Sequence, residues 1–134
     1  MVVKLKIIID SSLMIALFQK KGLKMEDLNS LSTELFFPKE CFEEIRKKAK
    51  FKPIYRPIIH GISKMLEKSR VKLLKLNDGG KSADDAIVDY LKKSNDKIVV
   101  ATGDMHLARR LKSMGFPVIL LRKDGRLEIP NSIM

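Results

Sequence analysis

The sequence predicts an α/β domain in which a parallel sheet of about five strands is covered by helices on both faces. Short apolar runs recur along the chain, and each is separated from the next by a segment whose apolar residues follow helical spacing. The runs are apolar throughout rather than alternating with polar residues, which is typical of parallel strands buried on both faces. The chain has 134 residues and contains no repeat or linker. We therefore predict a single domain over residues 1–134.

In the first half of the chain, Ile7-Ile8-Ile9 forms the clearest strand, and it ends abruptly at Asp10. Ser11 or Ser12 is expected to cap the helix that follows. Pro38 comes directly after a short apolar run and suits the first position of a later helix. The expected elements are a strand at about 4–10, helices at about 11–20 and 24–31, a strand at about 34–37 and a helix at about 39–50.

In the second half, Pro53 and Pro57 interrupt any helix that continues from residue 50, and a new helix is expected to begin at Pro57. Residues 77–80 form a turn signal, Ser82 follows as a helix cap, and Asp124-Gly125 is expected to make a hairpin-like turn. The expected elements are helices at about 57–66, 82–91 and 104–114, and strands at about 71–76, 97–102 and 117–121.

The chain is strongly basic, with 27 Lys and Arg against 16 Asp and Glu and a net charge of +11. This balance favours a polyanionic partner, of which nucleic acid is the common example. The alternative is a lysine-rich surface that aids solubility or reflects a thermophile-like composition. Trp is absent and aromatic residues make up only 6%. A base-stacking platform of the kind found in RRM and OB folds is therefore not expected.

Two further features bear on location. No apolar run approaches the roughly 20 residues that cross a bilayer, so no membrane partner is expected. The single Cys41 cannot form an internal disulfide and is compatible with a reducing cytosol. We predict a cytoplasmic protein.

Acidic residues follow the ends of several expected strands or begin the next helix. Because the carboxyl ends of parallel strands share one edge of a sheet, these groups are expected to converge there. Clustered carboxylates raise one another's pKa, and a divalent cation with a preference for oxygen, Mg²⁺ or Mn²⁺, relieves that cost. The chain offers no Cys/His set for zinc. The candidates are Asp10, Glu43 or Glu44, Asp84 or Asp85, and Asp104.

Neighbouring acids on a helix point about 100° apart, so only one of each pair is expected to face the site. An ordinary helix cap is the alternative role for Asp104. A metal held by carboxylates in a basic protein indicates phosphodiester hydrolysis, with basic residues outside the acidic pocket holding the backbone. The basic candidates, each of which could equally be a plain solvated side chain, are Lys20, Lys21, Arg46, Lys47, Lys50, Arg109 and Arg110.

Four segments together resemble the PIN-domain ribonuclease family. They are Ile7-Ile8-Ile9-Asp10-Ser11-Ser12, residues 37–45 (FPKECFEEI), Ala83-Asp84-Asp85-Ala86-Ile87, and residues 99–107 (VVATGDMHL). They occur in the family's order and span nearly the whole chain. The resemblance implies a three-layer, Rossmann-like α/β/α sandwich with a clustered acidic centre.

The resemblance assigns roles by position. Asp10, Glu44, Asp85 and Asp104 match the catalytic acids that bind Mg²⁺ or Mn²⁺. Ser11 and Thr102 match hydroxyl positions that assist the site, and Asp84 is a further supporting residue. The family usually has Asn where this chain has Gly103, and often Thr where it has Ser11.

The activity implied is metal-dependent endoribonuclease cleavage, in which a metal-activated water hydrolyses RNA and leaves 3′-hydroxyl and 5′-phosphate ends. Residues 118–129 and the Ala-Asp-Asp-Ala-Ile run are most similar to the archaeal and eukaryotic subgroup linked to small-subunit ribosomal RNA processing. The implied partners are single-stranded or structured RNA and a pre-ribosomal particle.

Two other functions are compatible with the same residues. One is a toxin ribonuclease that an antitoxin protein neutralises, and the other is a catalytically weak RNA-binding or ribosome-assembly protein. A homodimer is also expected from the resemblance. The apolar helices around Leu28 and around residues 58–66 could supply its interface.

Overall fold

The computed structural model describes residues 5–19, 25–31, 33–77 and 82–133. Lys20 and Lys21, two of the basic candidates, lie outside the described residues, as does most of the turn expected at residues 77–80. Among the described residues, no helix has both the length and the apolar character needed to cross a membrane.

The described part of the chain contains a six-stranded sheet with the strand order β3-β2-β1-β4-β5-β6. The first five strands of this order are parallel, as predicted, and β6 is antiparallel to β5. Strand β6 follows the predicted hairpin-like turn, in which the Arg122 N–H donates to the Arg126 carbonyl at 2.8 Å. The strands are β1 Leu5–Ile9, β2 Thr33–Pro38, β3 Lys72–Leu74, β4 Ile98–Thr102, β5 Val118–Leu121 and β6 Leu127–Glu128.

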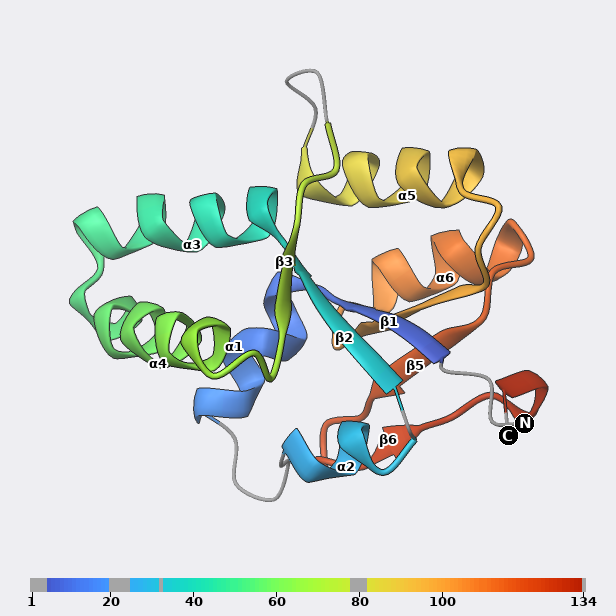
Figure 1. The fold of residues 1–134 in the computed structure, drawn as a ribbon, viewed down its shortest axis with the longest axis horizontal. Helices are drawn as coiled ribbons and strands as arrows, with labels where there is room; N and C mark the ends of the chain where they lie inside the picture. The colour runs from blue at the N-terminus through green and yellow to red at the C-terminus, as the bar shows by residue number, and fades with distance from the viewer. Residues whose placement is uncertain (1–4, 20–24, 32, 78–81, 134) are drawn as a thin grey trace.

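Helices cover both faces of the sheet, which confirms the predicted α/β/α sandwich. Figure 1 shows α1, α3 and α4 together on one side and α5 and α6 on the other. The chain moves one way across the sheet from β1 to β3 and the other way from β3 to β5, so right-handed crossovers place the two groups on opposite faces. The helices are α1 Ser11–Gln19, α2 Met25–Asn29, α3 Lys39–Phe51, α4 Arg56–Glu67, α5 Ala83–Lys93 and α6 Met105–Ser113, with short 3₁₀ helices η1 Pro53–Tyr55 and η2 Asn131–Ile133.

The core is densest around the two central strands. Residues 7–9 of β1 and residues 99–101 of β4 have no exposed surface. This burial follows from the strand order, in which β1 lies between β2 and β4 in the middle of the sheet. Asp10 directly follows the carboxyl end of β1.

The helix starts differ from the predictions in two places. The new helix α4 begins at Arg56 rather than Pro57, because η1 turns the chain just before it. Asp10, rather than Ser11 or Ser12, caps α1, since its Oδ1 atom accepts the Leu13 N–H at 3.0 Å. Ser82 caps α5 as predicted, with its Oγ accepting an N–H at 3.2 Å.

Candidate active site

Asp10 is the centre of the candidate site, and its side chain is almost completely buried, with 4% exposure. Its carboxylate accepts hydrogen bonds from the Leu13 N–H at 3.0 Å, from Ser12 Oγ at 2.8 Å and from Thr102 Oγ1. Burial raises the pKa of Asp10 to about 6, although these three donors favour the charged form and oppose the rise. The negative charge of Asp84 adds to it. The fold therefore holds a carboxylate in a place that penalises its charge.

Thr102 ties the ends of β1 and β4 together. The parallel register pairs Ile9 with Ala101, so Asp10 and Thr102 follow at adjacent strand ends. The buried Thr102 hydroxyl donates to Asp10 Oδ2 and accepts the Asp104 N–H at 2.9 Å. One hydroxyl thus fixes the position of Asp10 relative to the Asp104 backbone.

Ser12 completes this network and was not among the predicted site residues. Its Oγ donates to Asp10, accepts the Gly103 N–H at 2.9 Å and lies 3.3 Å from Thr102 Oγ1. The predicted supporting residue, Ser11, faces another way: its Oγ is buried without a hydrogen-bond partner among the described residues. The signal for Ser12 was its place two residues after a helix-capping aspartate, where a hydroxyl can reach back to the carboxylate.

Cys41 packs beneath Ser11. Burial raises the pKa of this thiol to about 12. The negative charges of Asp10 and Glu44 raise it further. A thiol with so high a pKa stays protonated and unreactive at neutral pH, so Cys41 serves the core rather than the chemistry.

Asp104 caps α6 and also belongs to the acidic cluster. Its Oδ1 atom accepts the N–H of His106 at 2.9 Å and of Leu107 at 3.4 Å. Its charge raises the pKa of Asp84, after the larger effect of burial. The two roles of Asp104, helix cap and acid of the site, are therefore compatible. The capping bonds orient a carboxylate whose charge acts on Asp84.

The neighbouring Asp84 and Asp85 side chains have different partners. Burial raises the pKa of Asp84, and the charges of Asp104 and Asp85 raise it further against the opposing charge of Arg110. The charge of Asp84 in turn raises the pKa of both Asp10 and Glu44. Asp85 instead forms an ion pair with Arg110, Nη1 to Oδ1 2.7 Å, at the half-exposed surface. Asp84 is thus the acid of α5 whose charge acts on Asp10 and Glu44, while the predicted Asp85 pairs with Arg110 and raises the pKa of Asp84.

The pair Glu43 and Glu44 lies on the exposed side of α3. Although Glu44 is largely exposed, partial desolvation raises its pKa. The charge of Asp84 adds to the rise, and Lys48 and Lys47 oppose it. Glu44 is therefore the member of this pair that is coupled to the acidic cluster.

The described basic candidates lie on α3 and α6. The Arg46 guanidinium stacks over the Phe42 ring at 4.6 Å, and Lys47 and Lys50 are exposed on the same helix. Arg109 and Arg110 border a hollow on α6 together with His106. Arg110 is engaged with Asp85, so Arg109 is the α6 arginine with no ion pair among the described residues.

The arrangement described above was compared with known proteins. The family model described as "PIN like domain" matches residues 7–124, which include all of the candidate acids. The chain belongs to this family. Among solved structures, it is similar to the PIN domain endonuclease Utp24, with a TM-score of 0.72 and 23% sequence identity over 93% of this chain and 92% of that chain. No curated protein matches.

The donor set of this PIN-like domain suits a hard divalent cation. Burial is the largest cause of the raised pKa values of Asp10, Glu44 and Asp84, and the charge of a neighbouring aspartate adds to each of them. Within the described ranges, no three His, Cys, Asp or Glu side chains are close enough together to hold a metal ion. Mg²⁺ usually binds through one or two carboxylates, several waters and substrate phosphates, so it does not require such a cage. The carboxylate oxygens of these residues are therefore the type of ligand that Mg²⁺ or Mn²⁺ prefers.

Proposed function

We propose that this PIN-like domain is an endoribonuclease that uses Mg²⁺ or Mn²⁺. The observation that carries the proposal is that Asp10 and Asp104 follow adjacent strand ends and are joined through Thr102, with the charge of Asp84 acting on Asp10. In this proposal, four elements bring four acids to the carboxyl edge of one sheet. Asp10, Asp84, Asp104 and Glu44 would hold the cation, in part through bound waters, because no three of the described side chains are close enough to bind it directly.

The residues of the chain divide the work. A bound divalent cation lowers the pKa of a water and stabilises negative charge at the phosphorus atom. Thr102 and Ser12 hold the Asp10 carboxylate in one orientation, so its position does not depend on the ion. With a pKa of about 6, Asp10 is mostly ionised at pH 7, as a metal ligand must be. Asp104 is oriented by its capping bonds.

The substrate proposal is RNA. A net charge of +11 favours binding of a phosphate backbone. The exposed Lys47 and Lys50 lie on α3, which carries Glu44, and the exposed Arg109 lies on α6, which begins directly after Asp104. Membership of the PIN-like family and a fold shared with a PIN domain endonuclease support cleavage within a strand. The resemblance of residues 118–129 to the ribosomal RNA-processing subgroup supports a precursor ribosomal RNA, met in a pre-ribosomal particle in the cytoplasm.

The test is cleavage of an end-labelled RNA with Mg²⁺, with Mn²⁺ and with EDTA. Asp84→Asn and Asp85→Asn form a matched pair, since both remove one charge from the first turn of α5. We expect Asp10→Asn and Asp84→Asn to lose about 100-fold or more in rate, and Asp85→Asn to retain activity within about threefold.

Three outcomes would count against the proposal. Cleavage that survives both Asp10→Asn and Asp84→Asn would belong to a contaminant or another site. An equal loss in Asp85→Asn would overturn the choice of Asp84. RNA that binds tightly but is never cut with either metal would identify a binding protein rather than a nuclease.

A further inference from the structure

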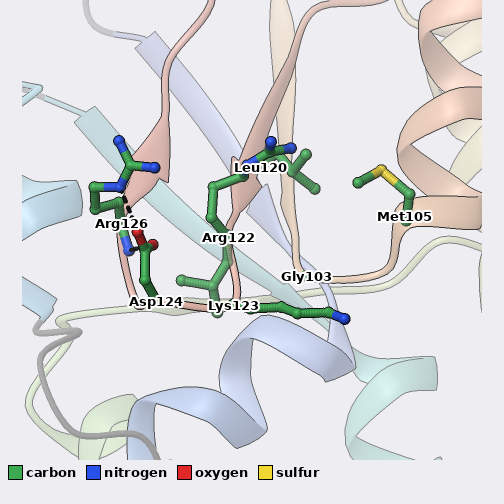
Figure 2. A pocket seen from close by; sticks show the side chains of 8 residues that line it. Gly103, Met105, Leu120, Arg122, Lys123, Asp124 and Arg126 are labelled. Carbon is green, nitrogen blue, oxygen red and sulfur yellow. Dashed lines mark hydrogen bonds and ion pairs between the residues drawn. The ribbon is translucent and has the colours of Figure 1, made fainter.

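A hollow of about 420 Å³ opens beside Gly103, at the same edge of the sheet as the acids. Figure 2 shows the side chains that line it. Met105 comes from the start of α6, Leu120 and Leu121 come from the end of β5, and Arg122, Lys123 and Arg126 come from the β5–β6 hairpin. The lining therefore combines apolar surface with three cationic side chains.

Gly103 forms the border between this hollow and the acidic cluster. It stands between Thr102 and Asp104 in the chain, and its N–H donates to Ser12 Oγ, which itself donates to Asp10. A Cβ atom added at Gly103 would lie 3.5 Å from Ser12 Oγ and 3.7 Å from Leu121 Cδ2. These are ordinary contacts, so a side chain is tolerated here, but it would occupy the border. Gly103 places no side chain at this border between the hollow and Ser12.

Hydrogen bonds within the hairpin hold its backbone and the Arg126 side chain. The Arg122 N–H donates to the Arg126 carbonyl at 2.8 Å, and the Gly125 N–H donates to the Arg122 carbonyl at 3.0 Å. Gly125 has a φ of +91°, which a residue with a side chain rarely adopts. Asp124 accepts both the Arg126 N–H at 3.1 Å and the Arg126 Nε–H at 2.6 Å. These bonds join the two sides of the turn and bind the Arg126 side chain to Asp124.

The charges in the hollow leave a positive balance. Asp124 is its acidic residue and is bound by Arg126, as the dashed line in Figure 2 shows. Arg122 lies 3.5 Å from Glu128. Lys123 is exposed and has no ion pair among the described residues, and its ammonium group extends toward Gly103 (Figure 2).

We propose that the hollow is a subsite for one nucleotide of the RNA, next to the phosphate that is cut. The base would lie against Met105 and Leu121, and Lys123 with Arg122 would bind its phosphate. A volume of about 420 Å³ falls in the range of small-molecule sites, and arginine side chains bind RNA both by stacking on bases and by pairing with phosphate. That the bound strand is RNA rests on the proposed function. That the ligand is a nucleotide is inferred from the residues that line the hollow.

The first test measures binding without cleavage. A short fluorescent single-stranded RNA is titrated in EDTA, and anisotropy gives its Kd for the wild type, Lys123→Glu and Lys97→Glu. Lys97 is exposed and precedes β4, so it lies at the opposite edge of the sheet, and both variants change the net charge equally. We expect Lys123→Glu to weaken binding about tenfold and Lys97→Glu to change it less than about twofold. Equal effects in the two variants would overturn the subsite.

The second test locates the ligand. Adenosine 5′-monophosphate, uridine 5′-monophosphate and inorganic phosphate are each titrated into the ¹⁵N-labelled protein. We expect saturable amide shifts at Gly103, Met105 and residues 121–126 with the nucleotides, and weaker shifts with phosphate alone. Gly103→Val, which fills the border, should reduce them while the remaining spectrum stays folded. Shifts elsewhere, or equal binding of inorganic phosphate, would overturn a nucleotide subsite.

The two proposals fail separately. If the wild type binds RNA through Lys123 but never cuts it, the nuclease is wrong and the hollow stands only as a nucleotide-binding site. If it cuts RNA and Lys123→Glu behaves like Lys97→Glu, the nuclease stands and the subsite is wrong.

Discussion

Replacing Asp10 with asparagine should stabilise the protein while it abolishes cleavage. The fold buries this carboxylate, and burial is the largest cause of its raised pKa. Asparagine has nearly the same shape and no charge. Its carbonyl can accept from Ser12 and Leu13, and its amide can donate to Thr102 if that hydroxyl turns toward Ser12, 3.3 Å away. The Asp10→Asn change therefore keeps the hydrogen-bond network and removes the free-energy cost of burying a charge.

The magnitude follows from the two pKa values. One pKa unit corresponds to about 1.36 kcal/mol, so a rise from 3.8 in the unfolded chain to about 6 in the fold costs about 3 kcal/mol at pH 7. Bonds to a carboxylate are stronger than bonds to an amide, which reduces the gain in the variant. We expect Asp10→Asn to be more stable than the wild type by about 1 to 3 kcal/mol at pH 7, with a Tm several degrees higher.

The pH dependence identifies the cause. Because the pKa of Asp10 is raised, its protonated form contributes stability that is complete below pH 3.8 and is lost as the pH rises through about 6. The advantage of Asp10→Asn should therefore be close to zero at pH 4 and about 2 kcal/mol larger at pH 7. Urea unfolding of both proteins at several pH values, in EDTA, measures it.

Asp96→Asn is the matched control, because it raises the net charge equally and removes an exposed partner of Lys6. Its effect should stay below about 1 kcal/mol and show no growth between pH 4 and pH 7. An Asp10→Asn variant that is less stable than the wild type at pH 7 would refute the reasoning. So would an advantage that is the same at pH 4 and pH 7.

Three further predictions concern the same edge of the sheet. Excess Mg²⁺ should raise the Tm of the wild type but not of Asp84→Asn, since an ion that binds only the folded state stabilises it; a wild type that does not respond in a thermal scan would contradict the cation proposal. Thr102→Val removes the hydroxyl that joins Asp10 to Asp104, and should lower the free energy of unfolding by about 1 to 3 kcal/mol in urea; an unchanged midpoint would show that this link carries no stability. Ser82→Ala removes the cap of α5 and should cost about 1 kcal/mol in the same assay, against which a neutral result would argue.

The architecture could be predicted because strand and helix signals are local. Wholly apolar runs indicated buried parallel strands, and the observed sheet contains five of them in addition to β6. The start of α4 was misplaced by one residue, since the η1 turn depends on how the chain packs against α3 rather than on the prolines alone. Helix caps were predicted where the residue type was unambiguous, as at Ser82.

The acidic edge could be predicted only up to a choice between neighbours. The order of strands and helices places Asp10 and Asp104 at one edge, but it does not show which way a side chain turns on a helix. Asp84 and Asp85 differ by about 100° of rotation, and Arg110, 25 positions away, engages one of them. The role of Ser12 was missed for the same reason, because it depends on Gly103 and Thr102 across the sheet.

The hairpin that carries Arg122 and Arg126 has a second consequence, for how copies of the protein can meet. Strand β6 covers the open side of β5, and is itself only two residues long. At the other end of the sheet, β3 is three residues long and carries the exposed Lys72, paired with Glu34 at 3.2 Å. Short, charged margins resist pairing of sheet to sheet between molecules. These margins therefore favour self-association through the helices over pairing of sheet edges, and Phe51, at the end of α3, is the most exposed of the large apolar side chains described.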